Sequence, residues 1–243
     1  MKARGILLTM LALSMWAFVS SAQGVWAKKD WQKWSQGDCK TIQEDSPWAQ
    51  KFTFGEVVQE GFGQPTPGAG RDTEQQYYYV IQFRSALPVR QAVIRTMQIQ
   101  NKYDRMTADQ KKQFDESALD FLNRKYEDVI VIHVYYGSSV ETDAREMARL
   151  WHSYSTGTVP QAATLIISKG ERVPPARFVA APGSAMEFEL IFPRHIEGRP
   201  LITPEVKSVA IEFQHPSVLG KASERVYKEF KVGKMMLNGE LVY

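Results

Sequence analysis

Histidines are the side chains of this sequence best suited to acid–base or metal chemistry, and two of the four lie where strands are expected to end. His195 belongs to the segment Pro193-Arg194-His195, just beyond an alternating strand pattern, and His215 precedes Pro216 at the end of another. Because sites are often built from loops at strand ends, Arg194, His195 and His215 are candidate surface-site residues. His195 and His215 would approach each other if their strands were neighbours.

The other two histidines have structural interpretations. His133 occupies the middle of a predicted strand on the face of Val131 and Tyr135, and no partner with metal-ligand spacing is near it. We therefore interpret His133 as a hydrogen-bonded histidine of the core or of a sheet face. His152 follows Trp151 on a predicted helix and is flanked only loosely by acids. Since no histidine has an evident catalytic or ligand-spaced partner, we assign no catalytic residue, no metal ligand and no cofactor.

Three carboxylates, Glu141, Asp143 and Glu146, gather at the start of the same predicted helix. Two carboxylates at a suitable separation can carry out hydrolysis. Acids at a helix N-terminus also stabilise the helix dipole, and no partner for them is evident on another element. The electrostatic role is sufficient, so we favour it over catalysis.

Tryptophans near the start of the chain form a third candidate set, because they alternate with lysines. Trp31 and Trp34 are candidates to stack on sugar rings or to contact a partner, since an aromatic ring offers a rigid apolar face with a polar edge. The alternative, which we favour, is that the tryptophans pack against one end of the sheet. The alternating residues are Trp26, Lys28, Lys29, Trp31, Lys33 and Trp34.

Familiar catalytic and phosphate-binding signatures are absent from the sequence. It contains no Gly-X-Ser-X-Gly elbow, no His-Glu-X-X-His helix and no P-loop. The glycines and prolines between Gly61 and Asp72 indicate a loop. Cys39 is the only cysteine, which excludes an intramolecular disulfide, and we interpret it as a small buried apolar residue rather than a reactive thiol.

The first residues of the chain predict export. Lys2 and Arg4 precede an apolar or small run from Gly5 to Val19, and Ser20-Ser21-Ala22 provides residues that a signal peptidase accepts. The run is too short to span a bilayer, so we expect a cleaved signal peptide over residues 1–22 and a periplasmic or extracellular protein.

Composition limits the partners of the remaining chain. After removal of residues 1–22, 28 basic and 27 acidic side chains remain. This near-neutral balance argues against a nucleic-acid partner. No second long apolar run follows, so we expect a soluble mature protein without a transmembrane anchor.

Apolar periodicity predicts strands on both sides of a helical block. Alternation indicates a strand from Tyr77 to Phe83 and another from Asp128 to Tyr136 that is covered on both faces. Antiparallel strands are expected after Gln161, and Asn238-Gly239 predicts a tight turn between two of the last strands.

Helix signals occupy the middle of the chain and one earlier position. Pro88 can open a helix, and Thr107 with Gln110 forms a capping box. A third helix is expected from Val140 to Tyr154, and Ser46-Pro47-Trp48 predicts a helix start. The helix after the capping box is expected to bury Phe114, Ala118, Phe121 and Leu122.

These elements predict an α+β fold, a mainly antiparallel sheet or sandwich with a two- to three-helix insertion between about residues 88 and 154. The expected organisation is a signal peptide over residues 1–22, a Trp/Lys-rich segment with a short helix over 23–50, and a single α+β domain over 51–243.

Two short stretches resemble a family of bacterial exported proteins of unknown function. They are Asp45-Ser46-Pro47-Trp48-Ala49 and the terminal segment from Lys231 to Tyr243, with looser similarity from Leu87 to Gln91 and around Phe192-Pro193-Arg194. The resemblance implies export and a shared fold. It carries no catalytic residue to this sequence.

Export together with missing catalytic signatures favours a non-enzymatic binding or interaction module of the bacterial cell envelope, with an envelope protein or a glycan as partner. Two alternatives remain open. One is an exported hydrolase with an unrecognised site, for which a pocket should bring His195 or His215 near a carboxylate. The other is an envelope subunit that assembles with copies of itself through exposed sheet edges.

Overall fold

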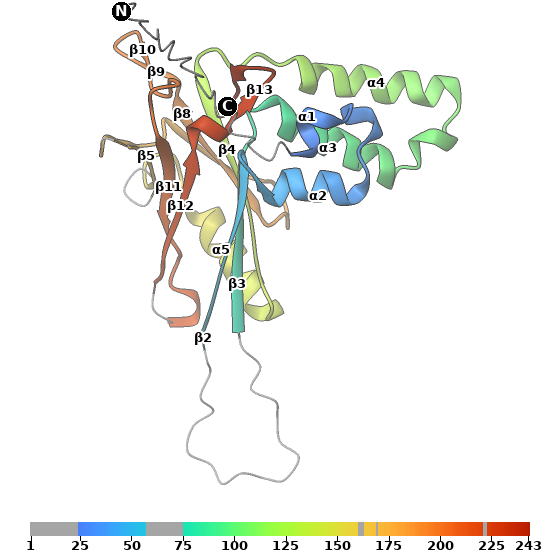
Figure 1. The fold of residues 1–243 in the computed structure, drawn as a ribbon. Helices are drawn as coiled ribbons and strands as arrows, with labels where there is room; N and C mark the ends of the chain where they lie inside the picture. The colour runs from blue at the N-terminus through green and yellow to red at the C-terminus, as the bar shows by residue number, and fades with distance from the viewer. Residues whose placement is uncertain (1–23, 57–74, 160–162, 169, 221–222) are drawn as a thin grey trace, which may run out of the picture.

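The computed structural model describes residues 24–56, 75–159, 163–168, 170–220 and 223–243. The expected signal peptide and the expected loop from Gly61 to Asp72 lie outside the described residues. The α+β fold is confirmed: two antiparallel sheets form a sandwich, and helices cover the outer face of the larger sheet (Figure 1).

The larger sheet has the order β1-β2-β3-β4-β8-β7, and all neighbours in it are antiparallel. Its strands are β1 (Asp45–Ser46), β2 (Ala49–Glu56), β3 (Gln75–Phe83), β4 (Val129–Ser138), β7 (Arg177–Ala180) and β8 (Glu187–Pro193).

The smaller sheet has the order β12-β11-β5-β6 and is also antiparallel. Its strands are β5 (Ala163–Ile167), β6 (Arg172–Val173), β11 (Ser208–Gln214) and β12 (Arg225–Lys231). Two small hairpins lie outside both sheets, β9 (His195–Ile196) with β10 (Arg199–Pro200) and β13 (Met236–Leu237) with β14 (Glu240–Leu241).

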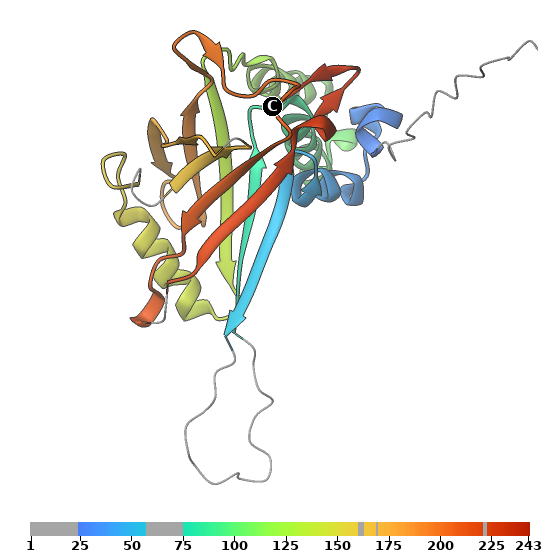
Figure 2. The ribbon, with the colours of Figure 1, turned by 60° about the vertical axis from the view of Figure 1, so that its left-hand side comes forward.

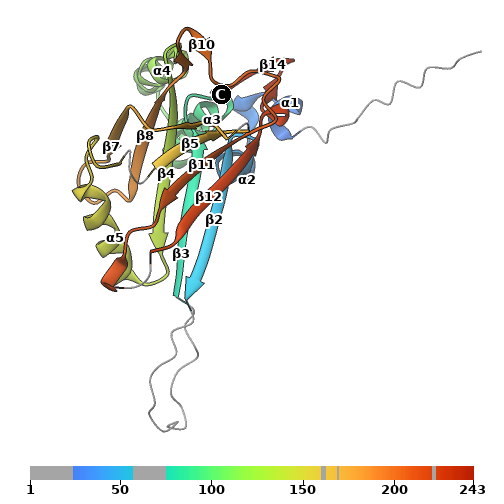
Figure 3. The same ribbon diagram turned by 90° about the vertical axis from the view of Figure 1, so that its left-hand side faces the viewer.

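The main core lies between the two sheets. Because side chains alternate along a strand, the face of β3 that carries Tyr79 and Phe83 turns toward the smaller sheet. Their ring centroids lie 5.0 Å from those of Phe213 and Phe230, respectively. Figures 2 and 3 show the smaller sheet over one face of the larger sheet, with α2, α3 and α4 on the other face.

Two of the long helices begin where the sequence signals placed them. Pro88 lies in the first turn of α3, and the capping box of Thr107 and Gln110 precedes α4. The α-helices are α1 (Val25–Lys28), α2 (Gln36–Glu44), α3 (Leu87–Gln100), α4 (Ala108–Asn123) and α5 (Glu141–Ser153). Short 3₁₀ helices span Trp31–Lys33, Tyr103–Arg105, Val218–Gly220 and Val232–Lys234. None of the helices in the described part of the chain is long and apolar enough to cross a membrane.

Helix α5 contributes to the main core rather than to the outer layer. Its Trp151 side chain is 1% exposed and contacts both sheets. The Trp151 ring centroid lies 4.3 Å from that of Phe188 in β8 and 5.7 Å from that of Phe213 in β11. Helix α5 therefore docks on the sheet, with its apolar stripe inside the sandwich.

A second, smaller core fixes the outer helices. Trp34, Cys39, Ile42 and Ala92 are buried together where α2 meets α3, and α2 also contacts β2 and β3. The interpretation of Cys39 as a buried apolar residue is confirmed, and burial raises the pKa of its thiol.

The expected helix start at Ser46-Pro47-Trp48 is wrong, because this segment is the turn between β1 and β2. The Ser46 hydroxyl donates to the carbonyl of Ile42 at 2.7 Å and accepts from the backbone N–H of Trp48 at 3.2 Å. A serine followed by proline satisfies a turn as well as a helix cap, and here the pairing with β2 decides between them. The turn at Asn238-Gly239 is confirmed, with φ values of 52° and 85°.

Candidate functional site

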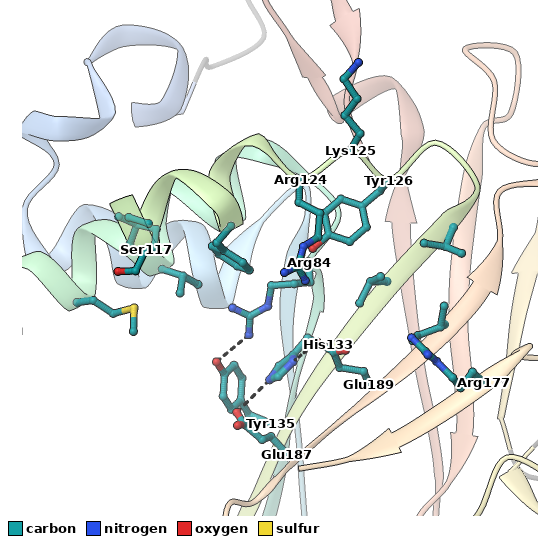
Figure 4. A pocket seen from close by; sticks show the side chains of 18 of the residues that line it. Arg84, Ser117, Arg124, Lys125, Tyr126, His133, Tyr135, Arg177, Glu187 and Glu189 are labelled. Carbon is teal, nitrogen blue, oxygen red and sulfur yellow. Dashed lines mark hydrogen bonds and ion pairs between the residues drawn. The ribbon is translucent and has the colours of Figure 1, made fainter. Parts of the chain in front are cut away.

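A groove of about 700 Å³ separates the outer face of the larger sheet from α3 and α4 (Figure 4). Its floor is formed by side chains of β4, β7 and β8 and by Arg84, which follows β3. Its opposite wall is formed by apolar residues of the two helices. This size is within the range of small-molecule sites.

The polar centre of the groove follows from strand register. His133 in β4 pairs with Glu189 in β8, and the next outward-facing pair is Tyr135 with Glu187. Because alternate residues share a face, these four side chains all project from the outer face of the sheet. His133 Nδ1 lies 3.2 Å from Glu189 Oε1, and its Nε2 lies 3.0 Å from Glu187 Oε2.

This arrangement fixes the charge of the two acids. The hydrogen bonds from His133 lower the pKa values of Glu187 and Glu189 against the opposing effect of burial, and the positive charge of Arg84 lowers them further. Both carboxylates are therefore ionised at neutral pH and only accept hydrogen bonds. Both ring nitrogens of His133 lie against these carboxylates, so neither is directed at a position where a substrate could give it a proton.

Arg84 lies at the centre of the groove with its guanidinium largely buried. The backbone of Arg84 is fixed beside β4, because its N–H donates to the carbonyl of Val131 at 2.8 Å. Its Nη2 donates to the Tyr135 hydroxyl at 2.8 Å, a bond drawn in Figure 4. Arg84 is 6% exposed, and no acceptor among the described residues lies within hydrogen-bonding distance of its Nε.

The helical wall is the apolar face of α4. The sequence predicts burial of Phe114, Ala118, Phe121 and Leu122, but of these only Ala118 is fully buried. Phe114, Ala118 and Phe121 line the groove together with Met97 of α3, which is 45% exposed. This apolar face contacts α3 but stands away from the sheet, so the expected burial is only partly achieved.

The tryptophans near the start of the chain pack, as we expected. Trp26 packs on the main core, with its ring centroid 5.3 Å from that of Trp48 at the turn between β1 and β2, whereas Trp31 and Trp34 belong to the second core. Trp34 is 1% exposed in the second core, and its Nε1 donates to the carbonyl of Lys29 at 3.0 Å. Trp34 is therefore not a surface residue. Trp31 is half-buried at the edge of the same core.

Arg194 and His195 lie at the end of the sandwich where β8 finishes. The Arg194 guanidinium stacks on the ring of Tyr243 at 3.8 Å, and its Nη1 donates to the carbonyl of that residue at 3.0 Å. His195 is exposed and belongs to the β9–β10 hairpin. The contacts of Arg194 hold the last residue of the chain.

His215 lies at the opposite end of the sandwich and is 2% exposed, so it too is not a surface residue. Its ring centroid is 4.8 Å from that of Tyr77, which pairs with the last residue of β4, whereas β8 ends beside the first residue of β4. A ten-residue strand is about 30 Å long, so His195 and His215 do not approach each other. His195 follows β8 of the larger sheet, and His215 follows β11 of the smaller sheet. The periodicity of a strand does not indicate to which sheet it belongs.

Buried aromatic and polar groups surround His215. The Tyr79 hydroxyl lies 2.7 Å from its Nδ1, and burial lowers the pKa of His215 to about 4, although the Asp143 carboxylate opposes this change. Asp143 is 2% exposed and accepts hydrogen bonds from the Gln75 amide and, at 2.5 Å, from the Tyr77 hydroxyl. His215 therefore lies near a carboxylate, but both groups are inaccessible to a substrate.

The carboxylate cluster at the start of α5 is divided among separate partners. Glu141 pairs with Arg145 and Glu146 with Arg149 on the helix surface, whereas Asp143 points inward. Among the described residues, no group of three His, Cys, Asp or Glu side chains could hold a metal ion.

Sequence reasoning missed Arg84, Glu187 and Glu189. The two glutamates alternate with Phe188 and Leu190, a pattern that is equally typical of a strand with one face in solvent. The sequence did contain one indirect signal. The strand of His133 is expected to be covered on both faces, and a strand that pairs with it places alternate residues on the same covered outer face. Their pairing depends on register between segments more than 50 residues apart, as the spacing of His133 and Glu189 shows.

The buried state of His215 predicts a specific dependence of stability on pH. Because its pKa is about 4 in the folded protein and near 6.5 in the unfolded chain, the unfolded chain binds the extra proton between these values. The stabilising contribution of the neutral ring is therefore lost as the pH falls through this window. Urea denaturation at pH 7 and at pH 5 measures the free energy of unfolding. From pH 7 to pH 5 this free energy should fall by about 2 kcal/mol more in the wild type than in His215→Asn. The amide oxygen of the asparagine can replace Nδ1 as acceptor from Tyr79. Equal losses in the two proteins would show that His215 does not cause the effect.

Comparison of the chain with protein-family models, with curated proteins and with solved structures finds no match. The groove between the larger sheet and α3 and α4 is therefore the feature from which its function has to be inferred.

Proposed function

We propose that this protein is an exported, non-enzymatic binding protein of the bacterial cell envelope, and that it binds a small amphipathic ligand in the groove between the larger sheet and α3 and α4. The observation that carries this proposal is the apolar face of α4, which lies over the polar centre of the sheet surface and leaves a groove there instead of docking on the sheet. An uncovered apolar helix face beside converging polar groups is typical of a ligand site.

The floor of the groove supports binding rather than hydrolysis. Both ring nitrogens of His133 are occupied by contacts with Glu187 and Glu189, so neither is directed at a nucleophile. The Ser117 hydroxyl at the opposite wall donates to the carbonyl of Phe114 at 2.8 Å, and in Figure 4 it lies across the groove from His133. A serine activated by this histidine is thus not part of the arrangement.

The sequence of the first 22 residues supports export. A basic start, an apolar run and small residues at its end are the three parts of a signal peptide. The near-neutral charge of the remaining chain fits a protein whose partner is neither a nucleic acid nor a strongly charged surface.

Filling the groove should abolish ligand binding without disturbing the fold. Ser117 is an exposed residue of α4 at the groove. Its neighbour Glu116, about 100° around the same helix, is also exposed and does not line the groove. Ser117→Trp should weaken binding of the neutral fluorophore N-phenyl-1-naphthylamine at least about tenfold, because the indole occupies the apolar half of the groove. The matched control, Glu116→Trp, should leave the affinity unchanged.

Fluorescence titration of the three purified proteins gives these affinities. The proposal is wrong if the wild type does not bind the fluorophore saturably, or if Ser117→Trp binds it as tightly as the wild type.

The export part of the proposal has its own test. When the whole chain is produced in a bacterial host, we expect the protein in the envelope or medium fraction, with an N-terminus at Gln23. Mass spectrometry of the purified protein determines this end. An uncleaved chain in the cytoplasmic fraction would contradict export.

A further inference from the structure

The guanidinium of Arg84 has fewer hydrogen bonds than a buried charge normally has. The described residues give it one, from Nη2 to Tyr135 at 2.8 Å, and its Nε has no acceptor. Buried donors without a partner destabilise a folded protein, and a charged donor does so more than a neutral one. The remaining donors of a side chain that lines the groove can be satisfied by an acceptor on a ligand.

The charges around Arg84 leave a positive excess at the groove. In the centre, Arg84 opposes two ionised acids, Glu187 and Glu189, which already make hydrogen bonds with the imidazole of His133. Three further cations line the groove and are exposed: Arg124, Lys125 and Arg177. Lys125 pairs with Glu127 at 3.6 Å, so Arg124 and Arg177 supply the excess charge. The field at the entrance therefore attracts an anion.

The opposite half of the groove is mainly apolar, and its Ser117 hydroxyl already donates to the carbonyl of Phe114. Met97, Phe114 and Phe121 face it from the helices, and Val131 and Ile191 contribute from the sheet. Burying hydrocarbon against these residues is favourable by about 25 cal/mol for each Å² removed from water. An inorganic anion would leave this surface exposed, whereas a molecule with a hydrocarbon chain would cover it.

We infer that the ligand is an anionic amphiphile, a molecule with a carboxylate or similar oxyanion head that binds Arg84 and a hydrocarbon body that lies between α4 and the strands β4 and β8. This inference rests on the proposed binding function and adds the chemical class of the ligand. A charged oxygen acceptor opposite a guanidinium forms shorter and stronger hydrogen bonds than a neutral one, so the head group determines selectivity and the chain determines most of the affinity.

Three probes of equal chain length separate these contributions. Decanoate, decanamide and decyltrimethylammonium have a negative, a neutral and a positive head, and each can compete with bound N-phenyl-1-naphthylamine at low salt. We expect the wild type to bind decanoate at least about tenfold more tightly than either of the other two. In Arg84→Met, which keeps an unbranched stem without the charge, the preference for decanoate over decanamide should fall to within about twofold.

Arg145→Met is the matched control, because Arg145 lies on the surface of α5 with its side chain 65% exposed and paired with Glu141. It should retain the wild-type preference. Circular dichroism establishes that the Arg84 variant is folded. If Arg84→Met does not fold, the preference of the wild type for decanoate over the other two amphiphiles decides the inference.

The possible outcomes distinguish the two proposals. Binding of the fluorophore with equal affinity for the three amphiphiles overturns the anionic ligand and leaves the proposed binding function intact. No binding of the fluorophore or of any amphiphile overturns both. A third outcome is that a folded Arg84→Met keeps the wild-type preference for decanoate over decanamide. This result would show that Arg84 does not recognise the head group, and it also overturns the inference.

Discussion

Strand β4 imposes the constraint on which the rest of the structure depends, because both of its faces are covered. Its inward residues, such as Ile132 and Val134, are fully buried against the smaller sheet and α5. Its outward residues also need a cover, and α2, α3 and α4 provide it on the other side of the larger sheet (Figure 1). The cover is closest over β2 and β3, where α2 makes contact, and it is incomplete over β4 and β8. The groove is the consequence of this incomplete cover.

The outward face of β4 and β8 is also unusual in its chemistry. It carries Arg84, His133 and two ionised glutamates close to apolar helix residues. The glutamate side chains remain 29% and 34% exposed, but Arg84 is buried, and the described residues give its guanidinium a single hydrogen bond. Burying a charge with so few partners costs stability. A charged cluster at this position is therefore not explained by folding stability, and recognition of a ligand gives it a physical reason.

Several elements of the fold could be predicted from the sequence because their signals are local. The capping box of Thr107 and Gln110, the two-sided apolar pattern of β4 and the turn at Asn238-Gly239 each depend on residues within a few positions of one another. The turn at Ser46 was mistaken for a helix start because both structures use the same local hydrogen bonds.

The candidate site could not be predicted in the same way. The burial of Trp34 and His215, and the convergence of Arg84, His133 and Glu189, arise from strand order and helix packing between distant segments. The stretches that carry the family resemblance also meet only in the folded chain. The Trp48 Nε1 donates to the carbonyl of Val242 at 2.6 Å, and Arg194 stacks on Tyr243. These motif residues therefore join the two ends of the described chain, and they lie outside the groove.

The most direct test of the account is a crystal structure of the protein grown with decanoate. We predict the carboxylate within hydrogen-bonding distance of Arg84 and the hydrocarbon chain between Phe121 of α4 and the strands β4 and β8. Decanoate bound elsewhere, or an α4 docked on the sheet with no space left for a ligand, would contradict the central claim that this groove is the binding site.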